Sequence, residues 1–310
     1  MRLTTSRAHA GARALPAVAI GLAVAILTAC GGGATPVGVS RQLKVVAGEN
    51  FWGSIATQLL GSHGRVQSVI TDANTNPHAY SSGSADARAF AEADIVILNG
   101  AGYDDWGRRL LETNPSTSRK VLLVSGVVGA RTGANPHFWY NPAMVGRVAD
   151  ALTRLYIVQD PPDSNDFSSL RRAFDQATQP YLAKVTEIKQ KYGGAPVGST
   201  ESVFLYMAQA LGLSLVTAPG FMQAVAEGSD PPAGLVAEFQ DQISQKKIKL
   251  LVYNSQTPLP ATTGIKAQAA SVGVPVVIIT ETIPPGPRTF QDWQLGQLRQ
   301  VEDSLAKQAA

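Results

Sequence analysis

The chain has 310 residues, of which 45% are hydrophobic and 16% are charged, and this is enough apolar sequence for two modest globular lobes. Its net charge of +3 comes from the first 29 residues, which hold three arginines and no acidic residue, so the remainder carries 23 basic and 23 acidic side chains. A neutral domain lacks the basic excess that supports nucleic-acid binding, and we expect no nucleic-acid partner.

Residues 1–29 have the pattern of a bacterial secretory signal peptide. Three arginines precede the apolar run 17–29, AVAIGLAVAILTA, which is too short and wrongly flanked for a membrane span. Cys30 follows Leu-Thr-Ala, which resembles the lipidation site of bacterial lipoproteins, and as the single cysteine it excludes an intramolecular disulfide. We expect a lipid anchor on Cys30 at the outer face of the cell membrane, with residues 30–40 as a flexible tether.

From residue 43 onward, short runs of β-branched and other apolar residues alternate with amphipathic segments of helical length. The first four runs predict strands at 43–47, 66–71, 94–99 and 120–125. The segments 50–61, 84–93 and 143–156 have helical spacing and are bounded by Gly, Pro, Ser or Asn.

Residues 163–192 are polar overall but carry apolar side chains three and four positions apart, which predicts one long helix. The stripe consists of Phe167, Leu170, Phe174, Ala177, Tyr181, Val185 and Ile188. A continuous helix here would be about 45 Å long, which suits a brace between two lobes. Because a proline inside a helix removes a hydrogen bond, Pro180 predicts a bend or a restart near Gln179.

A second group of four runs predicts strands at 195–199, 213–217, 248–254 and 274–280, with a helix at 201–212. Strands that alternate with helices form parallel sheets. We therefore expect an α/β protein of two lobes, residues 41–162 and 193–310. Each lobe should hold a four-stranded parallel sheet flanked by helices, and the helix at 163–192 should join them.

The tripeptide Asn-Pro-His occurs twice, at 76–78 and 135–137, in a chain with only four histidines. Proline fixes its own φ angle and holds the preceding residue extended, so each imidazole leaves a stiff loop and loses little entropy on binding a cation. Both loops follow predicted strands of the first lobe, and two glutamates directly follow strands of the second. Ligands of open α/β sheets bind beyond the carboxyl ends of the strands, so four side chains become candidate metal ligands: His78, His137, Glu201 and Glu281.

Each candidate also has a simpler interpretation. Asn-Pro is a common turn, which would leave its histidine as an ordinary surface residue, and a glutamate at a helix start interacts favourably with the helix dipole. The repetition favours ligation by His78 and His137, whereas position alone does not decide for Glu201 and Glu281.

Residues near the candidate ligands are expected to orient the loops or to pack beneath the site. Asn76 and Asn135 are placed to orient the histidine loops through hydrogen bonds. The neighbouring aromatic residues are more simply interpreted as packing beneath the site than as contacts to an ion; they are Tyr80, Phe138, Trp139 and Tyr206.

Motifs of common enzyme classes are missing. The sequence has no H-E-x-x-H, no G-x-S-x-G and no P-loop, and NGAGYDDWG lacks the spacing of a dinucleotide-binding loop. His63 lies in a predicted turn and is expected to face solvent. We expect that the chain is not an enzyme and that any ATP-driven step belongs to another chain.

Several segments, in their order along most of the chain, resemble the substrate-binding lipoproteins of metal-ion ABC transporters, the zinc and manganese family with the TroA-like fold. They are VVAGENFWGSIATQLLG, DANTNPHAY, AEADIVILNGAGYDDW, NPHFWYNPAMV, GSTESVFLYMAQALGL and GVPVVIITETIPPG. The resemblance implies two α/β lobes joined by a long helix, with one metal ion in the cleft. It also implies that the ion's ligands are His78, His137, Glu201 and Glu281.

The third ligand position bears on the metal. Zinc scavengers of the resembled family carry histidine there and manganese-type members carry glutamate, so Glu201 follows the manganese type. The fourth position is aspartate in much of the family, and Glu281 departs from that pattern by one methylene. Two imidazoles and two carboxylates suit Mn²⁺ and are also accepted by Zn²⁺. We expect one divalent cation as cargo, with manganese favoured and zinc or iron as alternatives.

The expected function is capture of this cation outside the cytoplasm and its delivery to an ABC-transporter permease that works with an ATPase subunit. The protein is expected to act as a monomer. Two alternatives are a metal-dependent enzyme of the two-histidine-one-carboxylate type, which would need open coordination positions, and a surface adhesin lipoprotein.

Overall fold

The computed structural model describes residues 42–131 and 133–308. The expected signal peptide, the tether and the lipidation site Cys30 lie outside these residues. In the described part of the chain, no helix is both long and apolar enough to cross a membrane. The described residues belong to one compact unit.

The first lobe is built on a parallel sheet with the strand order β2-β1-β3-β4. Its strands are β1 (Leu43–Glu49), β2 (Gly64–Ile70), β3 (Ile95–Leu98) and β4 (Lys120–Leu123). All four were predicted from their apolar runs. The last run was expected to extend to Ser125, but the chain turns into a short helix, α4 (Val124–Val127), after Leu123.

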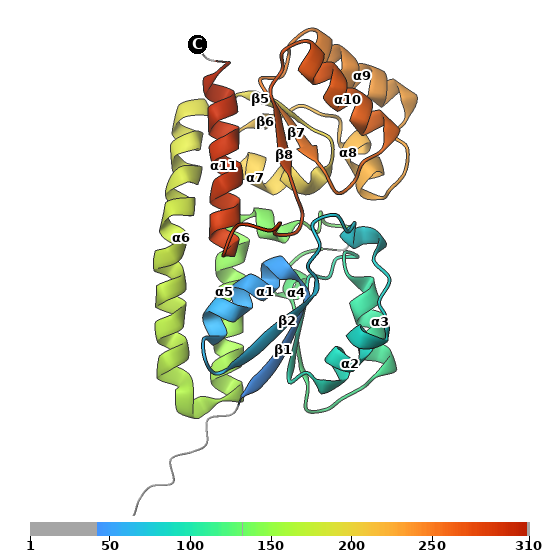
Figure 1. The fold of residues 1–310 in the computed structure, drawn as a ribbon. Coiled ribbons are helices and arrows are strands. Elements are labelled where there is room, and N and C mark those ends of the chain that lie inside the picture. Colours follow the sequence, from blue (N-terminus) through green and yellow to red (C-terminus); the bar gives the residue numbers. More distant parts are fainter. Residues whose placement is uncertain (1–41, 132, 309–310) are drawn as a thin grey trace, which may run out of the picture. The chain divides into compact units, whose positions relative to one another are not determined.

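Helices cover both faces of this sheet (Figure 1). They are α1 (Asn50–Leu60), α2 (Ser84–Glu92), α3 (Asp105–Thr113) and α5 (Pro142–Gln159). α1 buries its apolar stripe because Phe51, Ile55 and Leu59 recur at helical spacing and have no exposed surface. Asn141 caps α5, since its side chain accepts hydrogen bonds from the backbone amides of residues 143 and 144.

The second lobe repeats the arrangement with the strand order β6-β5-β7-β8, again parallel. Its strands are β5 (Pro196–Ser199), β6 (Ser214–Leu215), β7 (Leu251–Asn254) and β8 (Val276–Ile279). Its helices are α7 (Leu205–Ala210), α8 (Pro219–Ala226), α9 (Ala233–Ser244), α10 (Pro260–Ser271) and α11 (Phe290–Ala306). The prediction of two four-stranded parallel sheets is confirmed.

The long helix α6 (Ser164–Tyr192) passes Pro180 without interruption, so the predicted restart near Gln179 was wrong. Pro180 is exposed, and so is Gln176, whose carbonyl loses its helical partner and can bond to water instead. The buried side of the same turns is held by Phe174 and by Thr178, whose hydroxyl donates to the Phe174 carbonyl at 2.7 Å. Ala177, which was assigned to the apolar stripe, is exposed.

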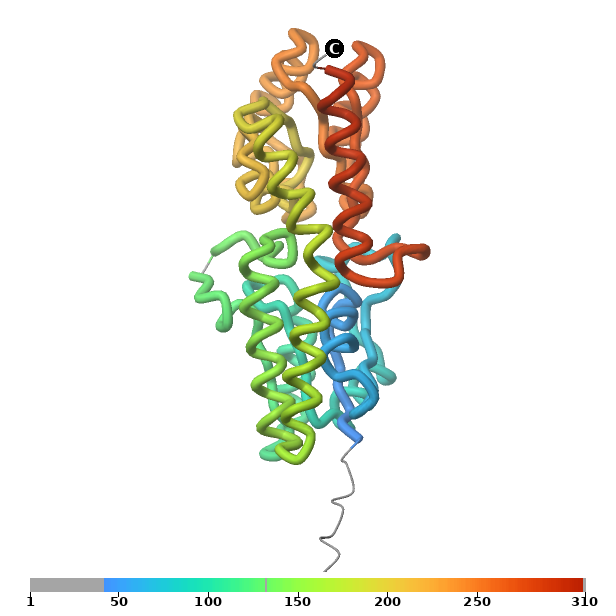
Figure 2. Tube along the Cα trace, turned by 90° about the vertical axis from the view of Figure 1, so that its left-hand side faces the viewer, coloured from blue at the N-terminus to red at the C-terminus, as the bar shows by residue number. Residues whose placement is uncertain are grey.

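α6 runs alongside both lobes, next to α5 of the first and α11 of the second (Figure 2). Lys184 joins α6 to α11 through Glu302, with Nζ and Oε2 2.5 Å apart. Further hydrogen bonds connect the lobes directly, since Asn50 of α1 exchanges two with the backbone of Ile283 at 2.8 and 2.9 Å. The exact boundaries predicted for the lobes stay a prediction.

Candidate metal centre

His78 lies in a short 3-10 helix, η1 (Pro77–Ala79), in the loop that follows β2. The side chain of Asn76 caps this turn, with its Oδ1 accepting the backbone N–H of His78 at 3.0 Å. Pro77 is buried and anchors the loop. Asn76 therefore orients this histidine loop as predicted, through the backbone.

His137 ends the loop that follows α4 and precedes η2 (Phe138–Tyr140). Asn135 Oδ1 accepts the backbone N–H of His137 at 3.0 Å and lies 2.6 Å from its Nδ1. In the neutral imidazole, Nδ1 therefore donates to Asn135 and Nε2 keeps its lone pair. This tautomer is the one that presents Nε2 to a cation.

Glu201 follows β5 and caps η4 (Ser202–Phe204), because its Oε2 accepts the backbone N–H of Val203 at 2.8 Å. Its Oε1 accepts the hydroxyl of Ser202 at 2.9 Å. The residue thus fulfils the simpler interpretation of a glutamate at a helix start, and it also faces His137 with its Oε1 3.8 Å from Nε2.

Glu281 lies in the loop after β8, two residues beyond Ile279. Its Oε2 accepts the hydroxyl of Tyr103 at 2.8 Å, and its Oε1 accepts the side-chain amide of Asn254 at 2.7 Å. Its backbone N–H donates to Gln256 Oε1 at 2.6 Å. Both the main chain and the carboxylate are therefore held in place.

The structure brings all four predicted side chains together between the lobes. Glu281 Oε2 lies 3.3 Å from His78 Nε2 and 3.6 Å from His137 Nε2. His78, His137 and Glu201 each offer one donor atom, and these three atoms lie within 4.8 Å of one another. The side chains of His137, Glu201 and Glu281 are fully buried, and that of His78 is 18% exposed.

The site holds strong opposing charges in a buried place. Burial raises the pKa of Glu281, but the nearby imidazoles of His78 and His137 outweigh burial and hold this pKa well below its ordinary value. Burial lowers the pKa of His78, yet the Glu281 carboxylate outweighs it and raises this pKa. Glu281 is therefore ionised, and a proton on His78 competes with any cation for the same place.

Glu49, at the end of β1, lies close enough to interact with Glu281 and Asp104. Its side chain is fully buried, and burial, reinforced by these two carboxylates, raises its pKa well above the ordinary value. Burial likewise raises the pKa of Tyr103, with Glu281 adding to the shift, so the phenol stays protonated and donates. Both effects favour the protonated form of Glu49, which carries no charge.

Two residues of the site escaped the sequence analysis. Asn254, the last residue of β7, donates from Nδ2 to Glu281 at 2.7 Å and to Glu201 at 3.3 Å. Tyr103 belongs to the loop after β3 and reaches Glu281 from the other lobe. Asn254 ends a parallel strand and Tyr103 lies in the loop after one, at the same carboxyl ends as the candidate ligands. This position in the sheet was the feature of the sequence that could have identified them as site residues.

The aromatic neighbours mostly serve packing, as predicted. Phe138 and Trp139 have no exposed surface, and Trp139 stacks on Phe51 with ring centroids 3.9 Å apart. Tyr206 instead spans the lobes, because its hydroxyl donates to the Asn135 carbonyl at 3.0 Å. Asn135 adds a second bond between the lobes, from Nδ2 to the Ser202 carbonyl at 2.7 Å.

The expectation that His63 faces solvent was wrong. Its side chain is only 11% exposed, and Nδ1 lies 2.8 Å from Asp163 Oδ2. Nε2 lies 3.4 Å from Asp166, and the ring is 4.8 Å from that of Phe167. The turn before β2 packs against the start of α6. Because these segments are a hundred residues apart in the chain, the local sequence does not reveal the contact.

The donor atoms fit a divalent cation. His78 Nε2 and His137 Nε2 are buried, and neither has a hydrogen-bond partner. A tetrahedral ion with bonds of about 2.1 Å separates its donors by about 3.4 Å, close to the 3.3 and 3.6 Å found here. Unpaired buried nitrogens are unfavourable unless something binds them. A cation held between the two imidazoles and the two carboxylates would be that partner.

Known proteins share this architecture. The family described as the periplasmic component A of the zinc-uptake complex matches residues 45–304. A manganese-binding lipoprotein of Halalkalibacterium halodurans is 25% identical over 205 residues, which are 62% of this chain and 67% of that protein. With two further curated relatives, the alignments span 59% and 66% of the relative's length.

Two solved structures have the same fold. The protein FpvC of Pseudomonas aeruginosa, in complex with Mn²⁺, has a TM-score of 0.72 at 18% identity, over 86% of this chain and 99% of that one. The laminin-binding adhesin of Streptococcus agalactiae has a TM-score of 0.70 at 19% identity, over 85% and 99%. At these identities the likeness concerns the fold alone.

The family match confirms the resemblance predicted from the sequence, and it supports a binding protein rather than the enzyme alternative. It covers both lobes and all four candidate ligands. The chain therefore belongs to the family of periplasmic components of zinc-uptake complexes.

Proposed function

We propose that this chain is the extracytoplasmic binding component of a metal-ion ABC transporter and that it carries one divalent cation between its lobes. The ligands are His78, His137, Glu201 and Glu281. The observation that carries the proposal is the pair of buried Nε2 atoms without hydrogen-bond partners, facing a carboxylate oxygen at 3.3 and 3.6 Å. The family membership supports it.

Each lobe supplies two donors, so a bound cation is coordinated from both sides of the interface. The charges of two carboxylates balance a divalent cation, which removes most of the electrostatic penalty of placing such an ion in a buried site. Nitrogen and carboxylate oxygen donors suit Mn²⁺, Fe²⁺ and Zn²⁺. We favour manganese, because the third donor is a carboxylate of Glu201, with zinc or iron as alternatives.

The partners follow from this role. The chain delivers its cation to a membrane permease whose ATPase subunit supplies the energy, and it acts as a monomer. A lipid on Cys30 attaches it to the outer face of the cell membrane, with residues 30–40 as the tether. Mass spectrometry of the protein purified from its own membranes tests the anchor, since an acylated amino-terminal cysteine is expected and an unmodified one contradicts it.

Metal analysis of the purified mature protein tests the site. We expect one divalent ion per chain, and we expect His78→Ala and Glu201→Ala to lose stoichiometric binding because each removes a donor. His63→Ala is the matched control, since it removes a largely buried histidine that lies beside Asp163, outside the proposed site. Full metal content in both site variants would refute the proposed ligands.

The identity of the cargo needs a separate measurement. The Irving–Williams order allows zinc to bind tightly in a test tube whatever the physiological metal is. Elemental analysis of protein taken from its own envelope, without added metal, reports the cargo under native availability. Manganese as the main element is expected, and zinc as the main element would contradict our preference.

A further inference from the structure

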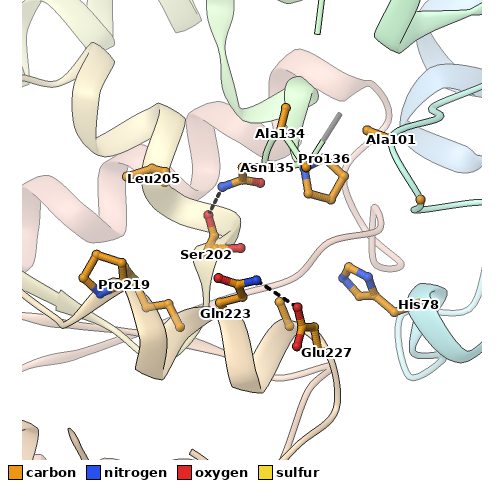
Figure 3. A pocket seen from close by; sticks show the side chains of 14 residues that line it. His78, Ala101, Ala134, Asn135, Pro136, Ser202, Leu205, Pro219, Gln223 and Glu227 are labelled. Atoms are coloured by element: carbon orange, nitrogen blue, oxygen red, sulfur yellow. Dashed lines mark hydrogen bonds between the residues drawn. The ribbon is translucent and has the colours of Figure 1, made fainter. Parts of the chain in front are cut away.

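A cavity of about 470 Å³ opens between the lobes next to the proposed metal site. Its first-lobe wall comes from two loops that include Gly102 and Ala134, and its second-lobe wall comes from Ser202 and from α8. His78 forms part of the lining, whereas the other three proposed ligands do not. Figure 3 shows the imidazole of His78 facing this space.

His78 is also the only proposed ligand with exposed surface, at 18% of its side chain, while the other three side chains have none. The exposed part of the His78 ring faces the cavity, while its donor atom Nε2 is turned toward the buried ligands. At about 30 Å³ per water molecule, the cavity has room for roughly fifteen waters, so it is large enough to hold a hydrated cation.

The cavity has a distinctive charge. Among the described residues that line it, Glu227 is the only acidic one, and His78 is the only other ionisable one. Gln223 Nε2 donates to Glu227 Oε1 at 2.9 Å and holds the carboxylate along the helix end. The remaining lining is mostly small or apolar, including Ala134 and Ala226. Glu227 and His78 are therefore the only described lining side chains that a cation meets with a carboxylate or an imidazole.

We infer that this cavity is the access route of the cation and that Glu227 is the residue that attracts the cation into it. This inference rests on the proposed function. Glu227 is exposed, so it acts through a screened, long-range field and raises the association rate rather than the final affinity. Low-polarity walls around one carboxylate focus that field along the cavity.

Stopped-flow mixing of the mature protein with Mn²⁺ alone tests the route, with tryptophan fluorescence as the signal because Trp139 lies 5.2 Å from the His137 ring. Ala226→Phe places a ring in the cavity, and Ala237→Phe is its control on the exposed face of α9. We expect Ala226→Phe to slow association and chelator-induced release by about the same factor, fivefold or more, since an obstruction changes the barrier and leaves both end states intact.

Glu227→Gln tests the electrostatic role. We expect association about two- to fivefold slower than in the unmodified protein at low ionic strength, with the difference vanishing near 0.5 M salt and the release rate unchanged. Glu238→Gln is the matched control, because Glu238 is an exposed glutamate of α9 that also accepts from a glutamine one helical turn away, at 3.4 Å.

Two outcomes would overturn the inference. Unchanged rates in Ala226→Phe would mean that the cation enters elsewhere. Equal association rates for Glu227→Gln and Glu238→Gln would remove the role of Glu227. Both outcomes leave stoichiometric Mn²⁺ binding intact, whereas an unmodified protein that binds no Mn²⁺ would refute the proposed function itself.

Discussion

Asn254 gives the sharpest test of how the site is organised, because it touches both proposed carboxylate ligands and is not a ligand itself. Its Nδ2 donates to Glu281 Oε1 at 2.7 Å and to Glu201 Oε2 at 3.3 Å, and its side chain is fully buried. Asn254→Ala removes the donor that both carboxylates share. The two carboxylates then lose a common support in a place that water does not reach.

The expected effect on binding follows from these contacts. Removing a group that orients a metal ligand typically weakens affinity about 10- to 100-fold, which corresponds to about 1.4–2.8 kcal/mol. A hydrogen bond to a charged group contributes about 1.5–3 kcal/mol, so the shorter bond to Glu281 alone accounts for this loss. Asn254 Oδ1 also accepts the backbone N–H of Gln256 at 3.0 Å, and its removal lowers the free energy of unfolding as well.

Competition with a chelator of known affinity measures the dissociation constant, and urea unfolding of the metal-free protein measures stability. Thr262→Ala is the control, since the buried Thr262 hydroxyl bonds both the amide and the carbonyl of Leu259 in the second lobe, away from the site. We expect the control to lose stability and keep its affinity. Unchanged metal affinity in Asn254→Ala would show that the carboxylates do not depend on this amide.

Three further predictions concern the protonation of His78, the contact between His63 and Asp163, and the movement of the lobes. Burial lowers the pKa of His78, but Glu281 outweighs burial and raises this pKa above its ordinary value. Because a proton and the cation compete for His78, the dissociation constant for Mn²⁺ should rise about tenfold per pH unit below that pKa. Calorimetry in two buffers measures the protons released on binding. The pKa of His78 is higher in the folded than in the unfolded protein, so the His78–Glu281 contact stabilises the metal-free protein at low pH. This stabilisation is lost as the pH rises through the folded pKa. A dissociation constant and a free energy of unfolding that both stay constant with pH would contradict this prediction. His63→Ala should lower the free energy of unfolding by about 1–2 kcal/mol, because it removes the contact with Asp163. Urea unfolding measures this change. A second ion bound by the unmodified protein would contradict a purely structural role for His63. Solution scattering should show no large compaction on adding metal, since α6 and the hydrogen bonds between the lobes already hold them together, and a large change in radius of gyration would refute this.

The central strands β1, β3 and β7 were predictable because each is a short apolar run, and the middle of a parallel sheet buries such runs on both faces. The carboxyl ends of the predicted strands then placed the four candidate ligands correctly between the lobes. Asn254 and Tyr103 occupy equivalent strand-end positions, but asparagine and tyrosine are common in loops of every kind. Their roles depend on contacts with Glu281, which Tyr103 makes across 178 positions in the sequence.

Pro180 and His63 show a second limit of sequence reasoning. Whether a proline interrupts a helix depends on where its missing hydrogen bond falls, and here both Pro180 and Gln176, whose carbonyl loses its partner, are exposed residues. Periodicity assigned Ala177 to the apolar stripe, but Ala177 is exposed and the neighbouring Thr178 is buried instead. The burial of His63 depends on α6, a hundred residues later, and no local pattern predicts such a contact.

The contacts between the lobes also constrain how the cation is released. Asn50 bonds the backbone of Ile283, and Gln256 Nε2 donates to the Thr75 carbonyl at 2.6 Å. None of these groups is a proposed ligand, and they join the lobes in this structure through bonds that include no cation. Release by spontaneous wide opening would have to break them together with the packing of α6. For the proposed function, these contacts favour local release, by displacement of a ligand loop or by the proton that competes at His78, over separation of the lobes.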